Sequence, residues 1–201
     1  MSVPDPLLDV VSDPVAAVRA AFDRAAHNAP SDHSAVALAT VTADGQPTVR
    51  MVLLRRLDAE GFLFFTNYGS RKARELDQAG RAALCLHWQW LEEQIRIEGR
   101  VRRATDAESD EYFASRPHGH QVAAWASRQS EPLSDRRLFE ERYRALEAEY
   151  EGRVVPRPPF WGGYRLVPDL IEFWKGAVNR LHDRVVYRRQ GAAWAAERQY
   201  P

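Results

Sequence analysis

Alternating apolar and polar positions dominate the chain from residue 34 onward, and this period of two predicts β-strands. Short turn sequences such as 43–46 and 58–61 separate several of the runs. The predicted strands cover residues 34–42, 48–57, 62–67, 82–90, 93–104, 162–168 with 169–176, 183–190 and 192–199. About seven or eight mostly antiparallel strands with helices between them favour a mainly β fold, a closed or split barrel. A doubly wound sheet is disfavoured because strict strand–helix alternation is missing.

Segments with helical periodicity interrupt the strands and begin at recognisable capping residues. Asp13 precedes Pro14 at the start of the first, Ser70 precedes the second, and Thr105 with Glu108 forms a capping-box pair for the third. The expected helices cover residues 14–27, 71–80, 105–113 and 134–150, with 117–133 a short helix or a loop. No repeat or linker divides the sequence, so we expect one domain over residues 1–201.

Charge and hydropathy narrow the class of protein. The 201 residues contain 28 Lys+Arg against 28 Asp+Glu, and this balance disfavours a nucleic-acid-coating protein or a polybasic membrane binder. No apolar run approaches the roughly 18 residues of a membrane span. The first residues carry acids where a signal peptide carries bases, so a cytoplasmic location is expected.

Common catalytic and metal-binding motifs are missing from the sequence. No GxGxxG, GxxxxGK, GxSxG or HExxH pattern occurs. Cys85, the single cysteine, lies in an apolar strand and is interpreted as a buried filler. His118 and His120 form the closest histidine pair, but without nearby carboxylates a polar loop is favoured over a metal site, and no metal is expected.

Cation placement is the most informative chemical feature. Ser70, Arg71 and Lys72 open a helix, where free backbone N–H groups favour an anion, so they form either a phosphate cradle or a solvated helix start. Further basic residues gather at the ends of predicted elements, and either anionic ligands or surface salt bridges would satisfy them. They are Arg50, Arg55, Arg116, Arg180, His182 and Arg184.

Eight runs, in order and covering nearly the whole chain from about residue 34, carry a resemblance to a known family. They are RMVLLR (50–55), FFTNYGSRKAREL (64–76), EEQIRIEGRV (92–101), ESDEYFASRP (108–117), AAWASRQS (123–130), VPRPPFWGGYR (155–165), IEFW (171–174) and RLHDR (180–184). In these runs the chain closely resembles the pyridoxamine 5'-phosphate oxidase family. The resemblance implies an obligate homodimer of FMN-binding split barrels, with residues 1–30 an N-terminal segment and helix and 155–201 a region for dimerisation and substrate.

The resemblance also implies which residues hold FMN, in a cleft to which both subunits contribute. The phosphate-side residues are Arg50, Ser70, Arg71 and Lys72. The residues lining the rest of the cofactor are Met51, Val52, Leu53, Leu54, Arg55, Phe65, Thr66 and Gln94. Those implied to come from the neighbouring subunit are Gln129, Ser130, Trp174 and Arg184.

Substrate binding and chemistry follow from the same resemblance. The vitamer phosphate would meet Arg55, Tyr112, Arg116 and His120, and the pyridine ring would meet Arg180, Leu181 and His182. Pyridoxamine or pyridoxine 5'-phosphate would give a hydride to FMN, with O2 as the final acceptor, yielding pyridoxal 5'-phosphate and H2O2, and with Arg180 and His182 as the catalytic residues.

Two substitutions leave alternatives open. Arg55 stands where the family usually has lysine, and His120 where it usually has serine. The same barrel also supports flavin oxidases of other rings, such as phenazine precursors, and flavin-binding modules without catalysis.

Overall fold

Eight antiparallel strands form the frame of the described part of the chain. The computed structural model describes residues 10–27 and 29–201, so the first nine residues of the N-terminal segment, which support the cytoplasmic prediction, lie outside the described residues. The strands are β1 (Ala35–Val41), β2 (Pro47–Asp58), β3 (Gly61–Asn67), β4 (Arg81–Trp88), β5 (Glu93–Arg103), β6 (Trp161–Lys175), β7 (Asp183–Gln190) and β8 (Ala193–Arg198).

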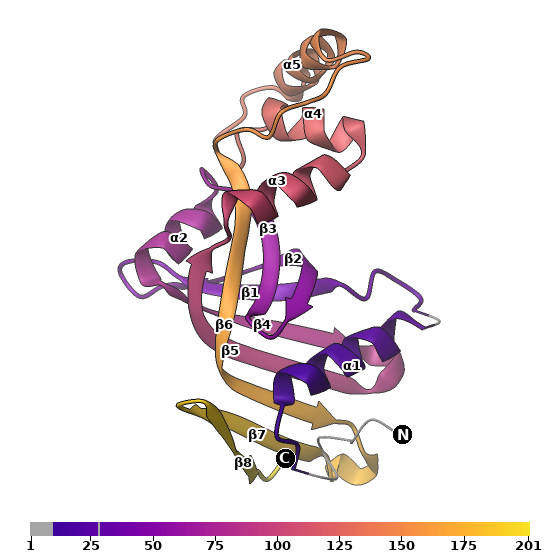
Figure 1. Cartoon of the computed structure of the whole chain (residues 1–201), viewed down its shortest axis with the longest axis vertical. Helices are drawn as coiled ribbons and strands as arrows, with labels where there is room; N and C mark the ends of the chain where they lie inside the picture. The colour runs from indigo at the N-terminus through magenta and orange to yellow at the C-terminus, as the bar shows by residue number, and fades with distance from the viewer. Residues whose placement is uncertain (1–9, 28) are drawn as a thin grey trace.

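Pairing of β3 with β6 closes the sheet into a barrel. The strand order is β3-β2-β1-β4-β5-β6-β7-β8, and the additional β3–β6 ladder joins the first and sixth positions. Six strands therefore close the barrel, while β7 and β8 continue the sheet beyond β6 (Figure 1). The predicted mainly β, split-barrel class is confirmed.

Helices lie beside the barrel and at one of its ends. They are α1 (Pro14–Ala26), α2 (Arg71–Ala79), α3 (Asp106–Ser115), α4 (His118–Ala126) and α5 (Arg136–Glu149), with short 3-10 turns η1 (Gln89–Leu91) and η2 (Val178–Arg180). Figure 1 shows α3, α4 and α5 gathered at one end of the long axis, with β7 and β8 at the other. The segment 117–133, for which a short helix or a loop was expected, begins with α4. None of the described helices is long and apolar enough to cross a membrane.

Buried apolar residues form two clusters. The larger one fills the barrel and its contact with α1, and includes Val18, Leu38 and Phe64. The smaller one lies under α3 and α4 and includes Phe113, Val122 and Trp161. Because inward and outward positions alternate along a strand, β2 contributes Leu54 to the core while Met51 and Leu53 face outward.

Two glycines at the start of β6 make room for the site described below. Gly162 and Gly163 pair with Thr66 and Phe65 of β3. A Cβ at Gly163 would lie 3.0 Å from the Phe65 ring and 2.7 Å from the Ala104 Cβ. Only a residue without a side chain therefore lets the Phe65 ring lie against this strand.

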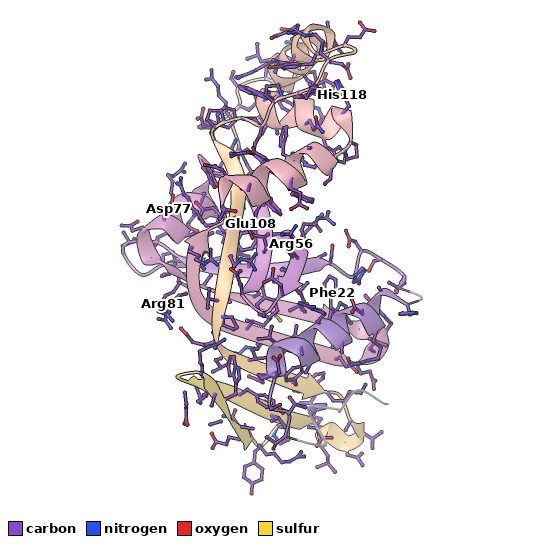
Figure 2. All side chains as sticks on the ribbon, viewed as in Figure 1. Phe22, Arg56, Asp77, Arg81, Glu108 and His118 are labelled. Atoms are coloured by element: carbon purple, nitrogen blue, oxygen red, sulfur yellow. The ribbon has the colours of Figure 1, made fainter. Side chains whose placement is uncertain are left out.

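A buried arginine fixes the start of α3 to the barrel. The Arg165 side chain is 1% exposed and forms ion pairs with Asp58 of β2 and Glu108 of α3. Glu108 also accepts from the backbone N–H of Thr105 at 2.8 Å, which completes the predicted capping box. Burial alone would raise the Glu108 pKa, but the hydrogen bonds from Thr105 and Arg165 outweigh it and hold the pKa at about 2. Figure 2 shows Glu108 where α3 meets the barrel.

Candidate functional site

A cavity of about 400 Å³ opens between β2, β3, α3 and α4. Backbone and side chains from six segments meet there because the barrel closes β3 onto β6 and places α3 and α4 above that junction. Of the residues predicted for the site, those lining the cavity are Met51, Val52, Leu53, Arg55, Phe65, Thr66, Lys72, Tyr112, Arg116, His120 and Gln129.

Lys72 is a cation that lines this cavity, and no carboxylate among the described residues forms an ion pair with it. Its Nζ donates to Gln129 Oε1 at 2.9 Å and to Thr66 Oγ1 at 3.1 Å, both neutral oxygens. Burial lowers the pKa of Lys72 to about 8, with a further lowering by the charge of Arg50 against a smaller rise from Glu75. A half-buried ammonium without a counter-ion is stabilised by an anionic ligand.

Glu75 organises the cations beside Lys72, and the sequence analysis did not identify it. Its Oε2 accepts from Arg50 Nη2 at 2.9 Å and its Oε1 from Arg71 Nε at 2.8 Å. Burial raises the pKa of Glu75, but hydrogen bonds from Thr40, Thr48 and the two arginines outweigh burial and hold it at about 2. The carboxylate is therefore charged at neutral pH and satisfies two of the three cations expected at a phosphate. Its position four residues after Arg71 on a predicted helix was the available signal.

Ser70 and Leu54 have structural roles in addition to those expected from the resemblance. The Ser70 side chain is fully buried and caps α2 by accepting from the Ala73 backbone N–H at 3.4 Å. The Leu54 side chain belongs to the barrel core, and its N–H donates to the Ser34 carbonyl. Neither residue lines the cavity.

A second group of cations surrounds another part of the cavity. The Arg116 guanidinium lies 4.8 Å from the Trp161 ring centre, and its Nη1 is buried without a hydrogen-bond partner. Burial lowers the pKa of Arg116, Tyr112 opposes this, and the charge of Arg55 adds to it. Within the described part of the chain, Arg55 and His120 form no ion pair or side-chain hydrogen bond. Within one chain these groups are therefore available to an anionic ligand, although the charge of Arg55 also helps to lower the pKa of Asp32.

Three aromatic rings form one wall of the cavity. The Phe65 and Tyr112 ring centres lie 4.1 Å apart with 19° between their planes. The Trp161 ring lies 5.5 Å from Phe65 with 7° between the planes. The stacked rings make this side of the cavity apolar next to its cationic groups, a combination that suits a ring carrying an anionic substituent. Trp161 was not among the predicted site residues, although its motif was noted.

The remaining predicted residues lie away from this cavity. The β6–β7 connection, residues 176–182, lies at the opposite end of the molecule from α4 (Figure 1). Gln94 pairs with Trp174 across β5 and β6, and the Trp174 ring lies 4.7 Å from that of His182. Six predicted site residues lie on this connection or next to it and do not line the cavity: Gln94, Trp174, Arg180, Leu181, His182 and Arg184.

Individual residues of this distant group differ in their partners. Arg184 is paired with Glu172 at 2.9 Å, so the salt-bridge alternative holds for it within one chain. His182 Nδ1 accepts from the Ala177 backbone N–H at 3.0 Å, and Leu181 is 71% exposed. Arg180 forms no ion pair with any described residue. One chain therefore presents two separate parts of the predicted site.

Gln129 and Ser130 lie where the cavity meets a second groove. Gln129 binds Lys72 in the same chain, whereas the resemblance assigned it to the neighbouring subunit. Ser130 lines only the adjoining groove, which extends between the 126–134 segment and α5.

The geometry thus defines a split-barrel protein with a cationic, aromatic-lined cavity, and comparison with known families gives the more specific assignment. The family model described as pyridoxamine 5'-phosphate oxidase matches residues 22–149, and that described as the pyridoxine 5'-phosphate oxidase C-terminal dimerisation region matches residues 161–201. The chain belongs to the pyridoxine/pyridoxamine 5'-phosphate oxidase family, whose members are oxidoreductases.

Curated relatives and solved structures agree with this assignment. A pyridoxine/pyridoxamine 5'-phosphate oxidase of Anaeromyxobacter dehalogenans is 56% identical over 90% of this chain and 92% of its own. That of Rubrobacter xylanophilus is 50% identical over 94% and 87%. The crystal structure of PhzG from Burkholderia lata 383, in complex with tetrahydrophenazine-1-carboxylic acid, has a TM-score of 0.93 at 32% identity and covers 100% of this chain and 98% of that one.

Proposed function

We propose that this protein oxidises pyridoxamine 5'-phosphate and pyridoxine 5'-phosphate to pyridoxal 5'-phosphate, using FMN and O2 and releasing H2O2. With the amine substrate, water hydrolyses the resulting imine and ammonia is released. The observation that carries the proposal is one cavity with aromatic rings on one side and two cations, Lys72 and Arg116, that have no carboxylate partner among the described residues and lie in different parts of it. Two phosphorylated ring molecules, the cofactor and the substrate, would satisfy these groups. The names of the relatives support the same reaction.

The residues around Lys72 fit the phosphate of FMN. Lys72 is half-buried among neutral oxygens, and Arg50 and Arg71 are held beside it by Glu75. Three cations against one carboxylate leave two net positive charges, which match a phosphate dianion. The cavity residues Met51, Val52 and Leu53 would lie along the ring system. When bound, FMN supplies a two-electron acceptor that is reoxidised by O2.

The residues around Arg116 would bind the phosphate of the vitamer. Arg116 and Arg55 supply guanidinium donors, and Tyr112 and His120 add a hydroxyl and an imidazole on the same rim. Arg180 and His182, placed by the partner subunit, would position the pyridine ring. The His182 imidazole would handle the proton that leaves the hydroxyl or amino group on the carbon that gives up the hydride.

Two chains are required because one chain keeps these groups apart. A homodimer is supported by the match of residues 161–201 to a dimerisation region. An exposed apolar row beside the cavity supports it as well: Val49 is 70% exposed, Met51 62% and Leu53 38%. Covering that row by a second copy would remove apolar surface from water and could bring Trp174, Arg180 and Arg184 of the partner to the cavity. A cytoplasmic location remains part of the proposal.

The proposal is tested with purified FMN-loaded protein in air. Each phosphorylated vitamer should give pyridoxal 5'-phosphate and H2O2 in equal amounts, and the Arg180→Ala variant should keep FMN but turn over far more slowly. Flavin binding without turnover of either vitamer would overturn the proposal and leave a flavin-binding module or an oxidase of another ring.

A second candidate function is favoured by the likeness to PhzG, whose structure holds a tetrahydrophenazine-1-carboxylic acid. A carboxylate on a polycyclic ring would also meet the cations around Arg116. Binding of that acid tighter than binding of pyridoxal 5'-phosphate, with oxidation of phenazine precursors but not of vitamers, would establish this candidate.

A further inference from the structure

We infer that Trp161 is a positioning residue that sets the strength of anion binding by holding the Arg116 guanidinium against its ring. The inference rests on the proposed function, because it assigns Arg116 to the phosphate of the substrate. It deepens that proposal by naming a residue outside the predicted site that governs how the phosphate is recognised.

The contact between the two side chains carries the inference. The guanidinium carbon of Arg116 lies 4.8 Å from the Trp161 ring centre and 5.6 Å from that of Phe113. A guanidinium beside an indole face is attracted by the ring quadrupole, most strongly where water is excluded. Trp161 is only 7% exposed, so the pair lies in such a place.

The hydrogen-bonding state of Arg116 shows what this arrangement is for. No described carboxylate pairs with Arg116, and its Nη1 is buried without a partner. An arginine that only stabilised the fold would gain from a carboxylate or carbonyl acceptor. The ring therefore orients a cation whose donors stay free for a ligand, and the cavity that both residues line supplies the space.

The Trp161 backbone is itself tied to the helix that carries Arg116's neighbour Tyr112. Arg157 Nη1 donates to the Trp161 carbonyl at 2.8 Å, and the same side chain pairs with Asp106 and Asp110 of α3. Because Arg157 joins the start of β6 to α3, the ring and the helix keep one relative position. The Trp161 ring also stacks nearly parallel to the Phe65 ring, and this second contact helps to hold its orientation.

The test uses the FMN-loaded dimer and equilibrium titration with pyridoxal 5'-phosphate, followed by competition with inorganic phosphate. Trp161→Leu should raise the Kd of both ligands about tenfold. This is the size expected when the cation–π contact is lost and the Arg116 guanidinium is no longer held in one orientation. FMN content should be unchanged, and KM for pyridoxine 5'-phosphate should rise while kcat stays within about twofold. Trp125→Leu is the matched control, because Trp125 packs in the same apolar cluster but contacts Phe160.

A double-mutant cycle distinguishes positioning of Arg116 by Trp161 from a general role of Trp161 in the stability of the fold. It uses Trp161→Phe, so it can be carried out even if Trp161→Leu does not fold. Trp161→Phe keeps a smaller ring and should raise the Kd of both ligands about threefold. This increase should vanish when Arg116→Ala is also present. Equal effects of Trp161→Phe with and without Arg116, or equal effects of the Trp161 and Trp125 variants, would overturn the inference and leave the proposed function standing. Wild-type protein that neither binds nor oxidises the vitamers would overturn both.

Discussion

Single residues decide the electrostatics of this site, and Glu75 fixes two of its cations in place. It gives Arg50 and Arg71 a buried partner and leaves Lys72 without one. The three cations expected at the FMN phosphate therefore have unequal roles. Two are fixed in place by the protein, and the third depends on the ligand for its counter-charge.

Lys72 should make FMN binding depend on pH. Its pKa in the free protein is about 8, below the ordinary 10.5, and a bound phosphate would raise it. Above pH 8 binding must therefore take up a proton, so the affinity for FMN should fall by up to about tenfold per pH unit. Fluorescence titration of FMN between pH 7 and 9 measures this.

Variants of the two lysines assign the effect. Lys72→Met should bind FMN more weakly and with a nearly flat profile over that pH range. Lys175→Met, which removes the other lysine and its pair with Glu93, should keep the wild-type slope. A Lys72→Met profile as steep as the wild type would show that another group takes up the proton.

Glu75 should stabilise the folded protein by an amount that decreases at acidic pH. Its folded pKa of about 2 is below the ordinary 4.5, so the contribution is complete above pH 4.5 and is lost as the pH falls toward 2. Glu75→Gln should cost about 3 kcal/mol of unfolding free energy at pH 7, because two arginines lose a buried partner. The loss should shrink below pH 4.5. Urea unfolding at several pH values measures it, with the exposed Glu151→Gln as control; an unchanged stability at pH 7 would contradict the role given to Glu75.

At the scale of elements, α3 links the barrel to the substrate-phosphate residues. Thr105→Ala removes the capping-box oxygen that accepts from the Glu108 N–H at 3.2 Å, and should cost about 1 kcal/mol of unfolding free energy. Because α3 carries Tyr112, KM for pyridoxine 5'-phosphate should rise more than kcat falls. Thr105→Ser keeps the hydroxyl and should behave like the wild type in denaturant unfolding and kinetics. A loss as large in Thr105→Ser would rule out the cap as the cause.

The strands, helices and caps could be predicted from the sequence because their signals are local. Alternation marked β5, and the spacing of Thr105 and Glu108 marked the start of α3. Closure of the barrel depends on β3 pairing with β6, about a hundred residues later, and no local pattern specifies that register. The contact of Trp161 with Arg116 likewise joins residues that are far apart in the sequence, so no local pattern predicts it.

At the scale of the whole molecule, the two parts of the predicted site lie at opposite ends of one chain (Figure 1). If each complete site combines them from two subunits, two impaired variants should complement each other. Mixing Arg116→Ala with Arg180→Ala under subunit exchange should restore about a quarter of wild-type activity, since half of the dimers then hold one intact site of two.

A matched mixture makes this result specific. Arg55→Ala mixed with Arg116→Ala should recover nothing, because both residues line the cavity of the same chain and no intact site forms. Failure of the Arg116 and Arg180 variants to complement, with subunit exchange shown by mass measurement, would contradict a shared site.

The proposed oxidation is tested most directly by anaerobic reduction of the bound flavin. FMN-loaded protein mixed without oxygen with pyridoxine 5'-phosphate or pyridoxamine 5'-phosphate should lose the visible absorption of oxidised flavin, and O2 should restore it with release of H2O2. A flavin that stays oxidised in the presence of both vitamers would contradict the account.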